Sequence, residues 1–305
     1  MKRNKPILVA GTMAFDEIIT TSANSGKIIG GAATYISYSS SFFTKDIYVS
    51  SIIGNDFPNS FLHEMNSKGI FTAMIEVSKK DKSFYWKGEY KNDFNNRVTH
   101  VTHLNALEFY KPNLNKHSIN FDLVMLGNLD PVIQMDIYSQ VKNDHNFVIL
   151  DTMNYWIEKT EKELFEIISK VNLVVINDEE SQMLGKSDLI EECAKNILSC
   201  GPDYIIIKKG SQGAELFSHH QRSTIPALDN IKVVDPTGAG DSFVGGVCGY
   251  LASRPNISFK EIHNAMIYGS VIASFCIEEF GLARLQKISK ENIDDRIKTF
   301  TSYLL

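Results

Sequence analysis

The sequence predicts an α/β protein with a central, mostly parallel β-sheet, helices on both faces of that sheet, and a small β lid. Short β-branched runs alternate with stretches of helical periodicity almost from end to end. Such strand–helix–strand repetition with short connections produces parallel sheets with right-handed crossovers. Most of the runs are also continuously apolar, as strands covered on both faces are. Ligands of such sheets bind at the carboxyl ends of the strands.

The elements follow in chain order. The apolar runs predict strands at Ile7–Gly11, Tyr48–Ile53, Phe121–Gly127, Phe147–Asp151, Leu173–Asn177 and Tyr204–Lys208. The helical periodicity predicts helices at Ala32–Phe43, Phe57–Lys68, Val132–Lys142, Lys162–Ser169, Leu189–Ser199, Phe243–Leu251, Phe259–Ile277 and Lys290–Phe300.

Two segments break this alternation. Thr20–Ile29 and Lys79–Asn105 are polar or locally alternating, with no helical period. In the second segment, Phe84, Trp86 and Tyr90 are separated by even numbers of residues, which places them on one face of a strand. We expect residues 20–29 and 79–105 to form lid strands apart from the main sheet, within a single domain spanning residues 1–305. A long surface hairpin without regular structure is the alternative.

Composition excludes several classes of protein. The 305 residues carry a net charge of −5, from 31 basic and 36 acidic residues, which argues against a protein that neutralises nucleic-acid phosphates. No apolar run reaches the roughly 18 residues of a membrane span. The start, MKRNKPILVAGTMAF, resembles a signal peptide, but Asp16 and Glu17 follow at once and no cleavage site appears. The four cysteines form no CxxC pair. We therefore expect a cytoplasmic protein that binds neither nucleic acid nor membranes.

The strongest chemical signal lies at Asp235–Asp241, which reads DPTGAGD and opens an amphipathic helix. Gly238, Ala239 and Gly240 have little or no side chain, so a ligand can approach their backbone N–H groups. Those groups, at the positive end of a helix, form an anion site. Asp241 would be counterproductive there unless it accepts a proton from an attacking hydroxyl, as phosphoryl transfer requires. The alternative is that Asp241 only complements the helix dipole.

This stretch resembles the C-terminal signature of the PfkB-type carbohydrate kinases, the ribokinase family. Further landmarks of that family occur in order along the whole chain. Asp16 stands just past the strand Ile7–Gly11, where the family has its acceptor-binding aspartate. The other landmarks are the di-glycine Gly30-Gly31, the N-x-x-E motif Asn177–Glu180 and the segment Lys208–Gly213, the last two each ending a strand.

The resemblance implies a ribokinase-like fold and an ATP-dependent kinase. It implies that Asp241 is the catalytic base and that Gly238, Ala239 and Gly240 form the anion hole. It places the nucleotide at Asn177, Lys208, Gly210 and Gly213, and Mg²⁺ at Glu180 through water. It also allows for a monovalent cation near Asp235. Taken alone, Asn177 could be a helix cap, Lys208 a solvated lysine and Asp16 a loop acid.

The acceptor is where the sequence departs from the family. The resemblance assigns acceptor binding to Asp16, Gly30, Gly31 and the position of Tyr35, where many family members have asparagine. A phenol cannot reproduce the donor–acceptor pair of a carboxamide, so ribose itself does not follow. We expect a sugar or related polyol; a nucleoside kinase and a non-catalytic sugar sensor are the alternatives. Exposed lid strands invite pairing with a second lid, so we expect a homodimer.

Overall fold

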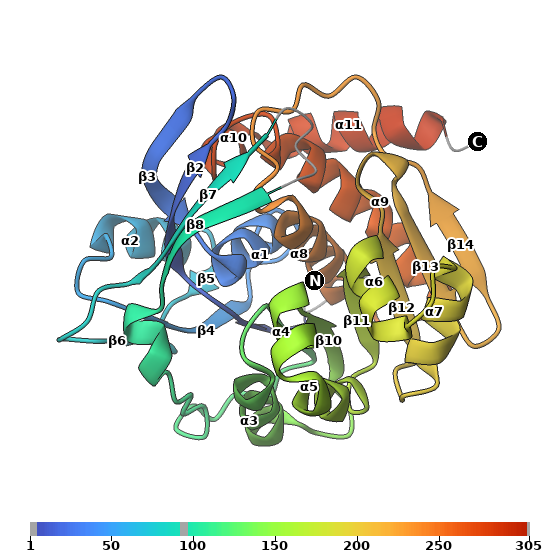
Figure 1. Cartoon of the computed structure of the whole chain (residues 1–305), viewed down its shortest axis with the longest axis horizontal. Coiled ribbons are helices and arrows are strands. Elements are labelled where there is room, and N and C mark those ends of the chain that lie inside the picture. Colours follow the sequence, from blue (N-terminus) through green and yellow to red (C-terminus); the bar gives the residue numbers. More distant parts are fainter. Residues whose placement is uncertain (1–4, 92–96, 304–305) are drawn as a thin grey trace.

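The computed structural model describes residues 5–91 and 97–303. Its main sheet runs in the order β14-β13-β12-β11-β10-β9-β1-β4-β5, with β6 pairing β4 (Figure 1). All neighbours from β12 to β5 pair in parallel, as does β6, whereas β13 and β14 are antiparallel. The strands are β1 (Ile7–Ala10), β4 (Ile47–Ile53), β5 (Ile70–Phe71), β6 (Ile75–Val77), β9 (Leu123–Leu126), β10 (Phe147–Asp151), β11 (Leu173–Asn177), β12 (Tyr204–Lys208), β13 (Ala214–Ser218) and β14 (Arg222–Ile225).

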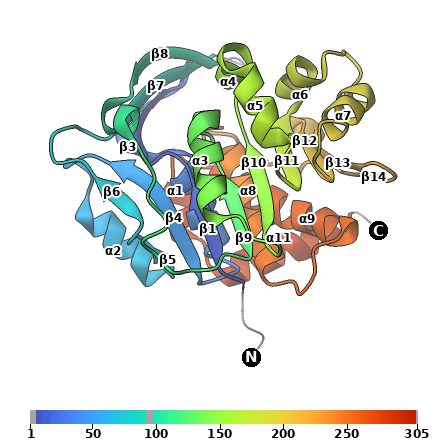
Figure 2. The ribbon, with the colours of Figure 1, turned by 90° about the horizontal axis from the view of Figure 1, so that it is seen from below.

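Helices cover both faces of this sheet, because successive strand residues point to opposite sides (Figure 2). Ile7 and Val9 of β1 pack in one core, whereas Leu8 and Ala10 pack in the other. The first core is closed by α1 (Ala32–Ser40), α2 (Asn59–Ser67), α8 (Ala239–Ala252), α9 (Phe259–Cys276), α10 (Ala283–Lys287) and α11 (Lys290–Ser302). The second is closed by α3 (Pro131–Val141), α4 (Asn154–Lys159), α5 (Glu161–Ile168), α6 (Asp178–Gly185) and α7 (Ile190–Leu198).

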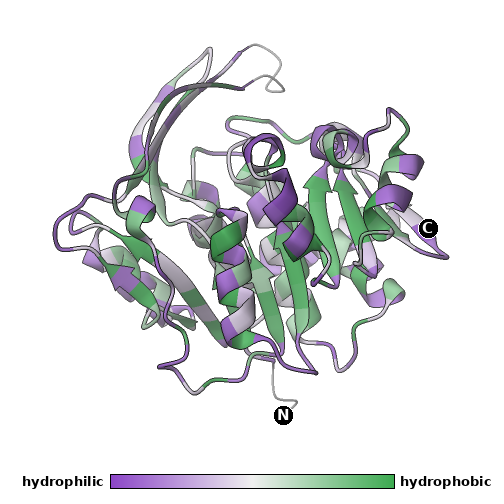
Figure 3. Cartoon of the chain, turned by 60° about the horizontal axis from the view of Figure 1, so that its bottom comes forward, coloured by the Kyte–Doolittle hydropathy of each residue, from purple (hydrophilic) through white to green (hydrophobic). Residues whose placement is uncertain are grey.

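A second, smaller sheet stands apart from the main one. It runs in the order β3-β2-β7-β8 and comprises β2 (Ala14–Ile19), β3 (Asn24–Gly30), β7 (Phe84–Tyr90) and β8 (Arg97–His103). Strand β2 pairs in parallel with β7, and the outer pairs are antiparallel. The small sheet curves on the side toward which the arrowheads of the parallel strands point (Figure 3). It therefore adjoins the edge where ligands of parallel sheets bind.

The predicted α/β fold with a separate small sheet is confirmed. Three of the predicted strands, β10, β11 and β12, have the predicted bounds, and the predicted helices are recovered with shifts mostly at their ends. Phe84, Trp86 and Tyr90 do lie on one strand, β7. The sequence did not predict β2, β5, β6, β13, β14, α4 or α10, and of α6 it indicated only the start, at Asn177.

One placement from the sequence was wrong. Asp16 was expected just past the carboxyl end of a main-sheet strand, but it lies inside β2, in register with Trp86 of β7. The chain leaves β1 after Ala10 and enters the small sheet at Ala14. Asp16 therefore belongs to the small sheet. Among the described residues, no helix is long and apolar enough to cross a bilayer.

Candidate active site

A pocket of about 460 Å³ opens at the carboxyl edge of the main sheet. Its floor is formed by strand ends, namely Asp151 of β10, Asn177 of β11 and Lys208 of β12. The start of α8 contributes Asp241 to it. Because parallel strands all end at one edge, residues far apart in the chain meet there.

The start of α8 has the geometry of an anion site. Its N-cap, Gly238, has φ +76°, a left-handed conformation that a side chain disfavours. The amide of Ala239 donates to the carbonyl of Pro236 at 3.1 Å. The amides of Gly238, Gly240 and Asp241 have no such partner within the described part of the chain. These unpaired N–H groups lie at the positive end of the helix, where they suit an anion.

Asp241 is a half-buried acid at this helix start. Burial raises the pKa of Asp241 to about 7; the negative charge of Asp151 adds to this, while Lys208 and Arg97 oppose it. A carboxylate with a pKa near neutrality can accept a proton during the reaction and release it afterwards.

Lys208 is the central cation of the pocket. Its Nζ lies 3.4 Å from Asp151 Oδ1 and 3.1 Å from where a Cβ on Gly240 would stand. Burial alone would lower the pKa of Lys208, but Asp151, Glu180 and Asp241 together raise it above its usual value. The ammonium is therefore charged at neutral pH and close to the unpaired amides of α8. A phosphate group there would meet both.

Asn177 and Glu180 form a reciprocal helix cap at the start of α6. Asn177 Oδ1 accepts from the Glu180 amide at 2.7 Å, and Glu180 Oε2 accepts from the Asn177 amide at 2.8 Å. This capping box matches the alternative considered for Asn177. Glu180 still lines the pocket. Burial raises its pKa to about 7, with Lys208 lowering it and Asp151 raising it further.

Magnesium fits this set of residues only in a hydrated form. Within residues 5–91 and 97–303, no three His, Cys, Asp or Glu side chains are grouped as ligands of one ion. Mg²⁺ usually keeps several waters and binds through one or two carboxylates plus substrate phosphates. Glu180 and Asp151, which line the pocket together, match that requirement.

Asp16, Gly30 and Gly31 meet where β2 and β3 lie next to α1. Asp16 is 5% exposed, and a side chain at Gly30 would collide with its carboxylate. Gly31 caps α1 with φ +92°. Burial raises the pKa of Asp16 to about 7; Asp235 and Asp241 add to this, while the Gly31 amide and Arg97 oppose it. The negative charge of Asp241 thus reaches Asp16, although Asp16, Gly30 and Gly31 are not among the residues that line the pocket.

Tyr35 lies deeper than the sequence suggested. It is completely buried in α1, and its ring packs beneath the anion-site glycine, since a Cβ on Gly238 would stand 2.5 Å from it. Tyr35 is not among the residues that line the pocket. Its hydroxyl has no hydrogen-bond partner among the described residues. Tyr35 therefore supports the start of α8 from below.

A second cavity, of about 580 Å³, adjoins the first. The two share Lys208, Pro236 and Gly240, and the second is also lined by Gly210 and Gly213. The predicted nucleotide residues are thereby divided. Asn177 lies in the first cavity, the two glycines lie in the second, and Lys208 stands where the cavities meet.

Several residues that line the pocket were not expected from the sequence, and three of them carry or contact charge in the site. Asp151 was read only as the end of a strand. Tyr90 and Arg97 come from the small sheet, where β7 and β8 place them opposite each other. The Tyr90 hydroxyl lies 3.2 Å from that of Thr237, which joins the small sheet to the loop before α8. The even spacing of aromatic residues pointed to Tyr90, but no local signal marked Arg97.

Asp235 stands at the start of that loop. Its carboxylate accepts from the amides of Thr237 at 2.8 Å and Gly281 at 3.1 Å. The loop before α8 is thus tied to the segment that follows α9.

Comparison with known proteins assigns the family. The model of the pfkB family of carbohydrate kinases matches residues 8–288. A nucleoside kinase from Methanocaldococcus jannaschii is 26% identical over 257 residues, covering 84% of this chain and 81% of that protein. A cytidine kinase from Thermococcus kodakarensis is 24% identical over 261 residues, covering 82% and 90%.

Solved structures agree in fold. A nucleoside kinase from Burkholderia thailandensis, solved with inosine, superposes with a TM-score of 0.81 at 20% identity, over 97% of this chain and 99% of that one. Because the family model spans most of the sequence, this chain belongs to the pfkB family of carbohydrate kinases.

Proposed function

We propose that this kinase transfers the γ-phosphoryl group of ATP to a hydroxyl group of a small sugar or polyol, with Asp241 as the general base. The observation that carries the proposal is the start of α8. A half-buried carboxylate whose pKa is about 7 stands beside unpaired backbone amides and within reach of the charge of Lys208. Phosphoryl transfer needs such a proton acceptor next to groups that stabilise phosphate charge.

The transfer would proceed as follows. Asp241 accepts the proton of the acceptor hydroxyl as its oxygen attacks the γ-phosphorus, and the bond from that phosphorus to the bridging oxygen of ADP breaks. The amides of Gly238, Gly240 and Asp241 donate to the transferring group, and Lys208 offsets its negative charge. Such preorganised donors need little rearrangement during the reaction.

Nucleotide and metal would occupy the two adjoining cavities. Gly210 and Gly213 line the cavity proposed for the base and ribose of ATP, whose phosphates would reach Lys208 and α8. Glu180 and Asp151 would hold Mg²⁺ through its waters, and the ion would neutralise phosphate charge. A monovalent cation near Asp235 would compete with the amide bonds that its carboxylate already accepts from Thr237 and Gly281.

The acceptor would bind between Asp16 and Asp241, under the small sheet acting as a lid. A carboxylate such as Asp16 can accept hydrogen bonds from two neighbouring hydroxyls. Gly30 leaves room for the carboxylate of Asp16 itself, and Gly31 lets the backbone pack closely against Thr12 and Ala14. Tyr90 and Arg97, which line the pocket, would close it from the side of the small sheet. Closure of such a lid excludes water, which otherwise competes as the acceptor.

A nucleoside is the second candidate acceptor. Trp86 lies in register with Asp16 on the small sheet, where its ring could stack on a base. Two relatives that each match more than 80% of this chain are a nucleoside kinase and a cytidine kinase. In a nucleoside, the phosphorylated group would be a ribose hydroxyl, so the chemistry at Asp241 is the same.

A panel of acceptors tests the proposal. ADP release would be measured with free sugars, polyols and nucleosides against a reaction without acceptor. We expect a large stimulation by at least one compound, with formation of its phosphate ester. Stimulation only by nucleosides would select the second candidate. No stimulation by any sugar, polyol or nucleoside would contradict the proposal.

A further inference from the structure

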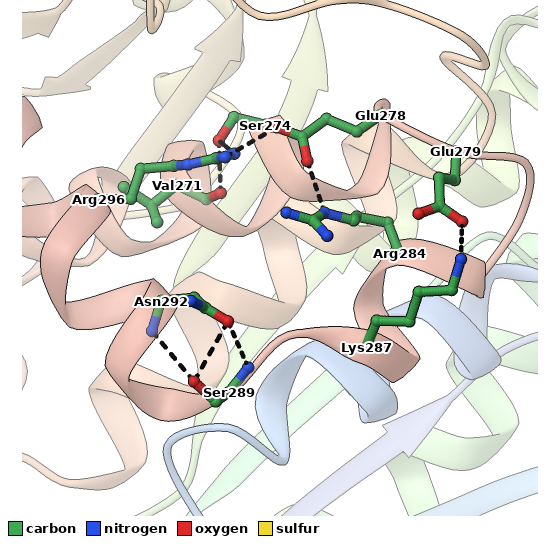
Figure 4. Close-up of polar contacts among 9 residues, drawn as sticks. All are labelled: Val271, Ser274, Glu278, Glu279, Arg284, Lys287, Ser289, Asn292 and Arg296. Atoms are coloured by element: carbon green, nitrogen blue, oxygen red, sulfur yellow. Dashed lines mark hydrogen bonds and ion pairs between the residues drawn. The ribbon is translucent and has the colours of Figure 1, made fainter.

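A polar network joins the last three helices, α9, α10 and α11 (Figure 4). Its centre is Arg296 of α11, which donates to Ser274 Oγ at 3.0 Å and to Glu278 Oε1 at 2.8 Å. The guanidinium carbon lies 3.4 Å from the ring centroid of Phe275. Arg284 of α10 donates to the other oxygen of Glu278 at 2.7 Å. Arg296 thus contacts Ser274 and Phe275 in the last turn of α9 and Glu278 just after it.

The first arm of this network ends in the wall of the cavity proposed for the nucleotide. Ser274 lines that cavity together with Ala273 and Ile277. Ser274 donates its own hydroxyl proton to the carbonyl of Val271 at 2.7 Å. The oxygen then accepts from Arg296, so both contacts fix the direction of this hydroxyl.

The second arm ends at the loop before α8. Glu278 follows Ile277, whose carbonyl accepts from the amides of Val234 at 2.8 Å and Asp235 at 3.3 Å. Gly281, three residues after Glu278, donates to the Asp235 carboxylate. Arg284 and Arg296 therefore both hold Glu278, which lies in the segment that anchors the loop before α8.

We infer that Arg296 is a positioning residue for nucleotide binding. The inference rests on the proposed nucleotide site. Arg296 holds Ser274 and Glu278 at the same time, because a guanidinium presents several donors in a fixed plane. Lysine carries one compact ammonium and cannot hold both groups in this geometry. Loss of Arg296 lets the cavity wall and the anchoring segment move. We expect this movement to weaken nucleotide binding more than acceptor binding.

The neighbouring ion pair Lys287–Glu279 provides a matched control. It lies beside the network on α10 and the same segment. Neither Lys287 nor Glu279 lines the nucleotide cavity. Lys287→Ala thus removes an ion pair of similar location without releasing the cavity wall.

The experiment measures ATP and ADP affinity of the full chain by calorimetry without acceptor, together with melting temperature. We expect Arg296→Ala to weaken nucleotide binding about tenfold, the scale of one lost charge-assisted hydrogen bond. Lys287→Ala should change it less than about twofold. Arg296→Lys should restore most of the melting temperature but not the affinity. With an active acceptor, KM for ATP should rise while KM for the acceptor stays constant.

A double-mutant cycle with Ser274→Ala tests the route of the effect. If Arg296 acts through Ser274, the effect of Arg296→Ala on affinity should be smaller in the Ser274→Ala background. Unchanged affinity in Arg296→Ala, or equal weakening in Lys287→Ala, would overturn the inference and leave the proposed kinase intact. If the effects of the two substitutions on nucleotide affinity are strictly additive, Arg296 does not act through Ser274, and the proposed route is overturned. Absence of nucleotide binding by the unmodified protein would instead contradict the proposed function.

Discussion

The position of Asp241 and its raised pKa are hard to reconcile if its carboxylate always stays charged. They are consistent if Asp241 accepts and releases a proton. It stands at a helix start suited to phosphate, and burial raises its pKa to about 7. A carboxylate placed only for the helix dipole would keep an ordinary pKa and remain charged. The burial and the nearby negative charge of Asp151 instead favour a group that changes its protonation state.

Asp241→Asn separates the two interpretations. If Asp241 is the base, turnover should fall roughly 10²–10⁴-fold, while ATP affinity persists because the backbone donors are unchanged. Melting temperature at pH 8 should hold or rise, since a buried charge is removed. A dipole residue would instead lose about 0.3–1 kcal/mol of stability and keep its turnover. Turnover above about a tenth of wild type would contradict the catalytic role.

Glu180 caps the start of α6, and this structural contribution must be separated from its proposed binding of Mg²⁺. Its capping contact with the Asn177 amide uses one oxygen, and the residue still lines the pocket. Glu180→Gln retains an oxygen that can cap but removes the charge that attracts hydrated Mg²⁺. We expect the Mg²⁺ concentration for half-maximal rate to rise several-fold, with an unchanged circular dichroism spectrum. An identical Mg²⁺ dependence would return Glu180 to capping alone.

The site residues that could be predicted are those with a local signal. Asp241 and the glycines before it stand in a run of small residues that opens a helix, and Asn177 and Glu180 have the spacing of a cap. Asp151 and Arg97 have no such signal, because their roles arise only when β10, α8 and β8 meet in space. Resemblance to a family supplied Asp16, but not its location inside a strand.

At the scale of elements, the buried parallel strands were predictable because both faces are apolar. The strand β2 was not, since it follows β1 after only three residues, and Gly11 among them marks a break but not its direction. Nothing in the local sequence indicates that the chain passes there from one sheet to another. The edge strand β14 and its neighbour β13 were missed as well, because both are partly polar.

Successive side chains of β2 point to opposite faces of the strand, so Asp16 and Glu17 should differ in their effect on acceptor binding. Asp16 is buried on one side of the strand, whereas Glu17 binds Tyr85 at 2.7 Å and Lys87 at 2.8 Å on the other. Asp16→Asn should raise the KM for the acceptor strongly, since each lost charge-assisted bond costs about 1.5–3 kcal/mol. ATP affinity should change little. Glu17→Gln, on the opposite face, should leave both constants near wild type.

Two results would contradict a role of Asp16 in acceptor binding. Equal losses of acceptor and ATP affinity in Asp16→Asn would indicate a general folding defect. An effect of the same size in Glu17→Gln would show that the strand, and not the carboxylate of Asp16, is responsible.

At the scale of the whole molecule, we expect two chains to pair through an edge of the small sheet. Strand β8 lies at that edge, and most of its residues are exposed, with Val98 39% exposed. Unpaired strand edges favour pairing with another chain, and lysine at an edge discourages it. We expect light scattering to give twice the 34.3 kDa of one chain. Val98→Lys should shift the protein toward monomer, whereas Val132→Lys, at an exposed position of α3, should not. A monomeric wild type would contradict this assembly.

The buried acids also determine how the stability of the whole molecule depends on pH. Asp16, Glu180 and Asp241 each have a pKa raised to about 7, mainly by burial. In the unfolded chain such acids titrate near their ordinary values, about 4. Between these values the folded state binds more protons than the unfolded state, so stability falls as pH rises. Glu17 behaves oppositely, because Lys87 and Tyr85 lower its pKa to about 2.

We therefore expect the melting temperature of the free protein to be highest near pH 5 and to decline steadily toward pH 8. Above pH 8 the three acids are charged in both states, so the decline should level off. Below pH 4, protonation of Glu17 removes its stabilising contacts and the melting temperature should fall again. The double variant Asp16→Asn, Asp241→Asn should flatten the slope between pH 5 and 8. Glu17→Gln should leave that slope unchanged, because Glu17 is ionised throughout this range in both states. A melting temperature that rises from pH 5 to 8, or an unchanged slope in the double variant, would contradict the assignment of these acids as buried and proton-binding.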